Sequence, residues 1–276
     1  LAGLLQRMQL LEQGVSARER ELVDALLFAA QPAARARAAD DLVDAALLKA
    51  GALLVVVVAP PGTPRGAAVD RDLRLSQLVL RAKRGLRHDA IAATTVDDHC
   101  LVVSVDARSD DADPALRVHG ALAGAPPPSS GAQRTVIAYG NRAPHGADAA
   151  RAYRQAALAA TVARGMESLG PVVGWAQLGV YQLLAQLPSG GFEDTDADAR
   201  LRVLLDRPEL VHTIETYLDL AGDAKRTAEL LNLHRASLYH RLNRVEEILR
   251  VDLKNGEERL ALHLALKALR LRRVLR

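Results

Sequence analysis

Hydroxyl and guanidinium side chains recur at helical spacing in the C-terminal part of the chain. Between Arg235 and Leu249, the residues Ser237, Arg241 and Arg244 follow one another at intervals of four and three residues, so they share one side of a helix. Side chains of these types donate hydrogen bonds to phosphate oxygens and to the edges of bases. The pattern therefore favours recognition of a nucleic acid over covalent catalysis.

A second set of residues in the same segment predicts how that side is presented. An apolar stripe recurs at intervals of 4, 3 and 4 residues and consists of Leu238, Leu242, Val245 and Leu249, which predicts a helix with one buried face. A shorter helix is expected before it, with Asp223 as its N-cap and a turn from Asn232 to His234. A helix that buries such a stripe and exposes hydroxyl and guanidinium groups suits the major groove of DNA.

Two runs in this region carry a resemblance to a known family. They are Leu233 to Leu249 (LHRASLYHRLNRVEEIL) and Val251 to Leu271 (VDLKNGEERLALHLALKALRL). They resemble the C-terminal helix-turn-helix domain of PucR/CdaR-type bacterial transcription regulators. The matching positions are His234-Arg235, Ser237, Leu238, Arg241-Leu242 and Arg244-Val245-Glu246-Glu247, whereas the departures are Ala236, His240 and Asn243. These departures bear more on which DNA sequence the domain would prefer than on whether it binds DNA.

The resemblance and the basic helix face together imply double-stranded DNA as the partner. The expected contact residues are Lys225, Arg226, Thr227, His234, Arg235, Ser237, Tyr239, His240, Arg241 and Arg244. Ser237 and Arg241 are the favoured base readers, because the N-terminal half of a recognition helix enters the groove. The three residues from Lys225 to Thr227 are placed for phosphates, which carry no sequence information. Such proteins bind paired half-sites as two-fold dimers, so a homodimer is expected.

Charge is unevenly distributed along the chain. Residues 225–276 contain 13 Lys and Arg against 6 Asp and Glu, a net charge of +7, whereas the whole chain carries +3. The first 224 residues therefore carry −4. A basic module on a slightly acidic body is expected when one domain meets phosphate. The alternative is a basic tail that is merely solvated, formed by Arg270, Arg272, Arg273 and Arg276.

Length and composition limit the remaining classes of protein. A chain of 276 residues has room for roughly two domains. Its single cysteine, Cys100, excludes an internal disulfide and fits a reducing compartment. The sequence shows no secretory signal, and the apolar run from Leu53 to Ala59 is too short to span a bilayer. We therefore expect a cytoplasmic protein with no membrane partner.

The N-terminal segment, residues 1–50, is expected to be a helical connector. Leu1, Leu4, Met8, Leu11 and Val15 keep the spacing of a coiled-coil seam. Two interpretations stay open: an amphipathic helix packed on its own domain, or a signalling helix that continues from a missing upstream sensor and pairs two subunits. Further helices are expected over Arg18–Phe28 and Ala36–Leu48.

The middle segment, residues 51–187, alternates between strand and helix patterns. The expected strands are Leu53–Ala59, Ala90–Val96, Cys100–Val105, Thr135–Tyr139, Val172–Trp175 and Leu178–Val180, and the expected helices are Leu73–Leu86, Pro114–Ala123 and Ala147–Glu167. This order and the Asp97-Asp98-His99 hairpin resemble the GGDEF-like domain of CdaR-type regulators. The predicted fold class is thus α+β: the helical connector, a GGDEF-like α/β domain, a linker over 188–206 and an all-α helix-turn-helix domain over 207–276.

The predicted hairpin argues against cyclase chemistry. Diguanylate cyclases place Gly-Gly-Asp/Glu-Glu-Phe there, whereas this chain has Val96 to Cys100 with no glycine. Asp97 and Asp98 alone cannot complete a two-metal phosphoryl-transfer site. The GTPRGA stretch from Gly62 lacks the Lys-Ser/Thr ending of a P-loop. We therefore expect no enzyme, no catalytic residue, no metal site and no cofactor.

Together these patterns predict a sequence-specific transcription regulator. The resemblance implies control of catabolic genes by a small-molecule effector, which no residue pattern identifies. The alternative is a sensory or interaction protein whose GGDEF-like domain binds a metabolite or nucleotide and whose C-terminal helices make only protein contacts. Salt dependence separates the two, because binding through several phosphates weakens steeply as salt rises.

Overall fold

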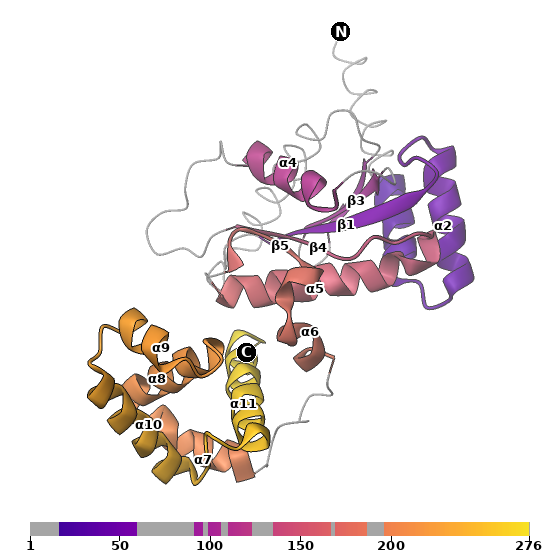
Figure 1. Cartoon of the computed structure of the whole chain (residues 1–276). Coiled ribbons are helices and arrows are strands. Elements are labelled where there is room, and N and C mark those ends of the chain that lie inside the picture. The colour runs from indigo at the N-terminus through magenta and orange to yellow at the C-terminus, as the bar shows by residue number, and fades with distance from the viewer. Residues whose placement is uncertain are drawn as a thin grey trace, which may run out of the picture. The chain divides into compact units, whose positions relative to one another are not determined.

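In a computed structural model of the chain, the described residues are 17–59, 91–95, 99–105, 110–122, 135–166, 169–186 and 196–275 (Figure 1). They divide into two compact units, Leu1–Gln182 and Leu183–Arg276. The coiled-coil pattern from Leu1 to Val15, the helix expected over Leu73–Leu86 and the Asp97-Asp98 pair lie outside the described residues. In the described part of the chain, no helix has both the length and the apolar character that crossing a bilayer requires.

A five-stranded sheet forms the centre of the first unit, with the strand order β2-β3-β1-β4-β5. The strands are β1 (Ala52–Ala59), β2 (Ile91–Thr95), β3 (His99–Val105), β4 (Val136–Tyr139) and β5 (Val172–Gly174). β1 pairs antiparallel with β3, where Val56 lies opposite Leu101, and with β4, where Val57 lies opposite Ala138. β4 and β5 run parallel. The continuous apolar run of β1 thus occupies the middle of the sheet, where both faces are covered.

Alternate side chains of β1 enter two different cores, because successive side chains of a strand point to opposite faces. On one face, Leu54, Val56 and Val58 pack with apolar residues of α4 (Ala112–Leu122). On the other face, Leu53 and Val55 pack with the N-terminal helices and with Ala149 and Ala152 of α5 (Ala149–Gly165). Figure 1 shows α4 and α5 on opposite sides of the sheet. The predicted mixture of helices and one sheet is confirmed.

The N-terminal helices belong to the same unit as the sheet. A helix over residues 17–28 and α2 (Pro32–Asp44) contribute Leu22, Leu26 and Leu42 to the core that contains Val55. The Glu19 carboxylate, which is buried, accepts a hydrogen bond of 2.7 Å from the backbone N–H of Ala93 in β2. The described part of the predicted connector is therefore fixed to the sheet by apolar packing and by a polar contact.

The strand predicted over Leu178–Val180 is wrong. These residues lie in a 3₁₀ helix, η3 (Trp175–Leu178), and at the beginning of α6 (Val180–Leu184). The Gln177 side chain accepts a hydrogen bond from the N–H of Gly174, and the Gln182 side chain donates one to the carbonyl of Trp175, both 2.7 Å long. These polar contacts close a helical turn that the apolar pattern alone does not show.

The second unit contains α7 (Asp196–Leu205), α8 (Pro208–Asp219), α9 (Ala224–Leu230), α10 (Arg235–Leu249) and α11 (Gly256–Leu275). Leu201 and Leu204 of α7 are buried in the same core as Leu238 of α10. The prediction of a linker over 188–206 is therefore wrong for residues 196–205, which form a helix of this unit. Pro208 begins α8 at a first-turn position, where its missing N–H removes no helical hydrogen bond.

Two glycines of the first unit allow a matched stability test. A Cβ atom on Gly140 would collide with the backbone of Ala152 in α5, whereas one on Gly120 in α4 would meet nothing within 4 Å. We expect Gly140→Ala to destabilise the protein by about 1–3 kcal/mol, because close-packed backbone must shift. Gly120→Ala should stabilise it by about 0.5–1 kcal/mol, because alanine loses less conformational freedom in a helix. Chemical denaturation of the two variants measures both effects, and equal stability of Gly140→Ala and the parent would contradict this packing.

Candidate nucleic-acid interface

Capping contacts hold the beginning of α9, its end and the beginning of α10. Asp223 caps α9, as predicted, because its carboxylate accepts a hydrogen bond of 3.0 Å from the N–H of Arg226. After α9, Asn232 adopts a left-handed conformation (φ +52°), and the N–H of Leu233 donates to the carbonyl of Ala228. This is the hydrogen bond that closes a Schellman turn. Nδ1 of His234 then accepts from the N–H of Ala236 at 3.3 Å and caps α10.

The predicted apolar stripe of α10 is buried and fixes the orientation of this helix. The exposed fractions are 0% for Leu238, 4% for Leu242, 0% for Val245 and 1% for Leu249. These side chains share one core with Leu210, Ile214 and Leu218 of α8 and with Leu262 and Leu266 of α11. Because one face of α10 is committed to this core, the opposite face must meet the solvent.

The exposed residues at the beginning of α9 and along α10 as far as Arg244 form one candidate surface. We call this set the α9–α10 surface; it consists of Lys225, Arg226, His234, Arg235, Ala236, Ser237, Tyr239, His240, Asn243 and Arg244. Ala236 and Asn243 were not among the predicted contacts. The helical period of the buried stripe would have placed both on the exposed face, so the sequence did contain that signal.

Two predicted contacts need correction. Thr227 is fully buried, and its hydroxyl donates a hydrogen bond of 2.6 Å to the carbonyl of Asp223. It therefore stabilises the first turn of α9 instead of facing a phosphate. Arg241 is half-buried against α8, where its Nη1 donates to Oγ1 of the buried Thr213 at 3.2 Å. The prediction that Arg241 lies on the exposed face is wrong, because its position on the helix borders the apolar stripe.

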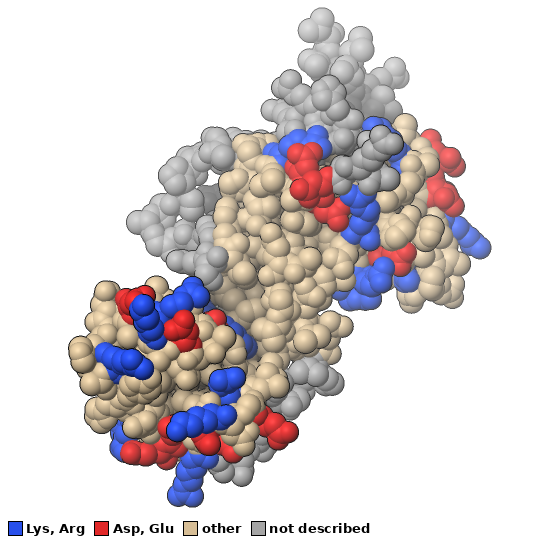
Figure 2. All heavy atoms as spheres, viewed as in Figure 1, with Lys and Arg blue, Asp and Glu red and all other residues tan. Residues whose placement is uncertain are grey.

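A hollow of about 520 Å³ lies between α9 and the beginning of α10. Its lining residues are Lys225, Ala228, Glu229, Asn232, Leu233 and Arg235. Lys225 and Arg235 favour an anion there, whereas the Glu229 carboxylate opposes one. On the face drawn in Figure 2, basic side chains of the second unit, at lower left, lie among acidic ones. Basic and acidic side chains are therefore mixed on this face.

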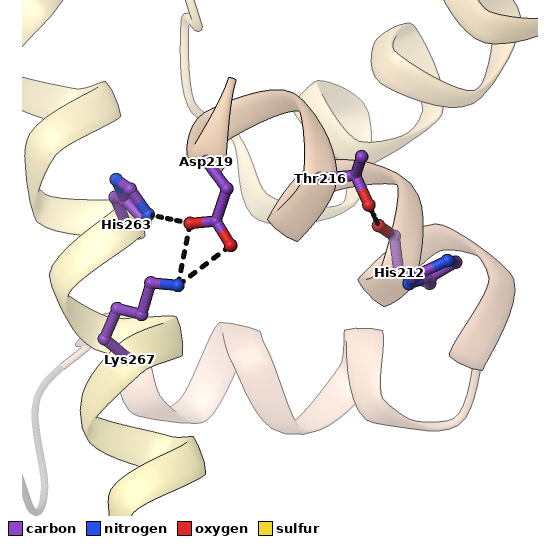
Figure 3. Close-up of polar contacts among 5 residues, drawn as sticks. All are labelled: His212, Thr216, Asp219, His263 and Lys267. Carbon is purple, nitrogen blue, oxygen red and sulfur yellow. Dashed lines mark hydrogen bonds and ion pairs between the residues drawn. The ribbon is translucent and has the colours of Figure 1, made fainter. Parts of the chain in front are cut away.

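An ion-pair cluster joins α8 to α11, the two helices against which the apolar stripe of α10 packs. Figure 3 shows the Asp219 carboxylate between two side chains of α11. It lies 2.8 Å from Nε2 of His263 and 2.7 Å from Nζ of Lys267. Burial by itself raises the pKa of Asp219, but hydrogen bonds from Lys267 and His263 outweigh burial and lower that pKa. In the same view, the Thr216 hydroxyl donates to the carbonyl of His212 within α8.

The comparisons with known proteins agree with the C-terminal assignment. Residues 210–268 match the family model of the PucR C-terminal helix-turn-helix domain. Over these residues the C-terminal unit is similar to PucR-type helix-turn-helix domains. This match spans the stretch from α8 to most of α11, so it includes the α9–α10 surface and the core beneath it. The predicted resemblance of this region is thereby confirmed.

Two further proteins are similar over different lengths. A DNA-binding transcriptional activator, AdeR of Bacillus subtilis (strain 168), is 28% identical over 123 residues, which cover 42% of this chain and 29% of the relative. The chain thus matches less than a third of that relative's length. The crystal structure of the Regulator of Polyketide Synthase Expression from Bifidobacterium adolescentis has a TM-score of 0.37 at 17% identity and covers 93% of this chain and 99% of that chain. None of these matches names a GGDEF-like domain, which stays a prediction.

The ion pairs of Asp219 should make the stability of the second unit depend on pH. The pKa of Asp219 is lowered from its ordinary value of 3.8 in the folded state, so the ionised carboxylate stabilises that state above pH 3.8. This stabilisation is lost as pH falls through the lowered pKa. We expect Asp219→Asn to destabilise the second unit by about 0.5–1 kcal/mol at neutral pH, because the partly exposed pair is screened by water. Urea denaturation at several pH values measures this difference.

The exposed Arg244–Glu247 pair supplies the control. Glu247→Gln removes one carboxylate that lies outside the α8–α11 contact, so it should change stability little. A destabilisation by Asp219→Asn that persisted unchanged below the lowered pKa would show that the ion pairs are not its cause.

Proposed function

We propose that this chain is a DNA-binding transcription regulator that contacts double-stranded DNA through the α9–α10 surface. The observation that carries the proposal is the orientation of α10 within a unit that matches a helix-turn-helix family. The core uses one stripe of the helix, so Arg235, Ser237 and His240 are left exposed. A helix of this width with exposed polar groups in its first half fits the major groove.

Lys225 and Arg226 complete the proposed contact at the phosphate backbone. Both side chains are exposed at the beginning of α9, and Lys225 lines the same hollow as Arg235 at the beginning of α10. In helix-turn-helix proteins the first helix of the motif crosses the backbone while the second enters the groove. Contacts to phosphate fix the register and make affinity sensitive to salt.

The proposal for the first unit is a GGDEF-like domain without catalytic activity. Its described elements keep the order of strand, hairpin strands, helix, strand, helix and strand, and the helix predicted after the first strand lies outside the described residues. We further propose that the chain acts as a homodimer in the bacterial cytoplasm, that it controls catabolic genes, and that a small molecule regulates it. The alternative function is a sensory or interaction protein that binds no DNA. It would use the same first unit and would need no contact with a DNA groove.

Selection of genomic DNA fragments by the purified chain at two salt concentrations tests the main proposal. We expect enrichment of one motif with paired half-sites that survives the higher salt, because base contacts add to phosphate contacts. Lys225→Ala and Arg226→Ala should each weaken binding about equally on all sequences and reduce the salt slope by about 1. Lys254→Ala removes an exposed lysine outside the α9–α10 surface and serves as the control. Retention that ignores sequence and vanishes with salt would favour the alternative function.

A surface hollow of the first unit is the place that we propose for the small molecule. Its volume is about 710 Å³, and its polar lining includes Asp40 and Asp44 of α2, Lys49 and His145. The lining combines charges of both signs with apolar residues such as Val43 and Leu53, which suits a small zwitterion or polar metabolite. A metabolite that binds there raises the unfolding temperature, and Asp44→Lys should abolish that rise. An undiminished rise in this variant would place the effector elsewhere.

A further inference from the structure

The three arginines on the first three turns of α10 differ in what holds their guanidinium groups. Arg241 donates to the buried Thr213 hydroxyl of α8. Arg244 forms an ion pair of 2.7 Å with Glu247 on its own helix. Among the described residues, Arg235 has no ion pair like that of Arg244 and no hydrogen bond to the core like that of Arg241. Its Nη2 lies 3.4 Å from the Tyr239 hydroxyl, and its guanidinium carbon lies 5.5 Å from the centre of the Tyr239 ring.

The contact between Arg235 and Tyr239 orients a charged group without neutralising it. Both residues are exposed, and they are four positions apart, so they lie on adjacent turns of one helix face. A tyrosine ring attracts a guanidinium through its quadrupole and carries no net charge itself. A guanidinium has five N–H donors, so a single bond to the Tyr239 hydroxyl leaves donors for another partner. Because the long arginine side chain is already ordered, it loses less conformational entropy on binding.

The place of Arg235 on the helix decides what that partner is. Arg235 is the first residue of α10, directly after the His234 cap, and N-terminal residues of a recognition helix contact base edges in the major groove. Guanine presents two acceptors there, N7 and O6, at a spacing that matches two N–H groups of arginine. An adenine presents one acceptor and one donor at the same edge, which arginine cannot pair in full.

We propose that Arg235 is the specificity-determining residue of the α9–α10 surface and reads a guanine, with Tyr239 as the positioning residue that holds its guanidinium. This inference rests on the proposed function. In it, Arg235 replaces Arg241 as the expected base reader. Arg241 could reach a base only by leaving Thr213, whose hydroxyl is fully buried. Ser237 stays exposed, but a hydroxyl pairs with several bases and discriminates weakly.

Selection from a random duplex library by the full chain tests the inference. We expect the parent to enrich a motif with a guanine in each half-site. Arg235→Ala should reduce the preference for that guanine about ten- to a hundredfold while the other positions stay unchanged. Arg235→Gln should shift the preference at the same position to adenine, because a glutamine amide pairs with N6 and N7 of adenine.

Variants of Tyr239 and Arg241 separate positioning from folding. Tyr239→Phe keeps the ring, so it should retain the guanine preference within about threefold, whereas Tyr239→Ala should lose most of it. Arg241→Ala should lower the unfolding temperature, because it removes the bond to Thr213, yet keep the guanine preference. Circular dichroism of each variant confirms that the helices are formed before selection begins.

The outcomes of this selection are distinguishable. If the parent enriches no motif, the proposed function fails, and the inference fails with it. If the parent enriches a motif that Arg235→Ala and Arg235→Gln also enrich unchanged, the proposed function stands and the inference is overturned. Loss of the guanine in Arg241→Ala with retention in Arg235→Ala would return the reading role to Arg241.

Discussion

The burial of one apolar stripe on α10 is the interaction on which the C-terminal unit depends. Leu238, Leu242, Val245 and Leu249 hold this helix against α8 and α11, and burying each of these side chains is worth about 1.5–3 kcal/mol. Turning α10 so that Arg241 faced outward would expose part of the stripe. The cost would exceed the roughly 1 kcal/mol that one new hydrogen bond returns. The core therefore decides which polar residues of α10 are exposed.

A similar constraint shapes the first unit. With aromatic residues at only 3% of the chain, its cores are built mainly from leucine, valine and alanine. β1 supplies both cores, because its alternate side chains point to α4 on one face and to α5 and the N-terminal helices on the other. Such a strand must lie in the middle of the sheet. The hollow beside α2 is lined both by charged residues and by Leu48 and Leu53 of the core.

Periodicity predicted most of the described elements, and it failed where polar contacts decide the backbone. The stripe of α10, the N-cap at Asp223 and the strand β1 all follow from residue types and spacing. The turn at Trp175–Leu178 does not, because the side chains of Gln177 and Gln182 close it. The acidic stretch before Leu201 suggested a linker, although the buried leucines of α7 make it part of a core.

The candidate site was predicted less completely than the fold. The sequence predicted α10 and most of its exposed residues, since the buried stripe leaves only one face open. The prediction missed that Thr227 bonds back to Asp223 and that Arg241 donates to Thr213. The Arg241 contact joins two helices, so spacing along one helix does not give it. The Thr227 contact spans only four residues in the first turn of α9, so the sequence did contain a signal for it. The contact between Arg235 and Tyr239 could have been inferred from their four-residue separation.

Photo-crosslinking of the full chain to duplex DNA that contains bromodeoxyuridine tests the central claim most directly. Mass spectrometry of the products shows which peptide lies against the bases. The account predicts crosslinks in the first half of α10, at or near Tyr239 and His240, and few in α11. Crosslinks confined to α11 or to the first unit would contradict it, because the α9–α10 surface would then lie away from the groove.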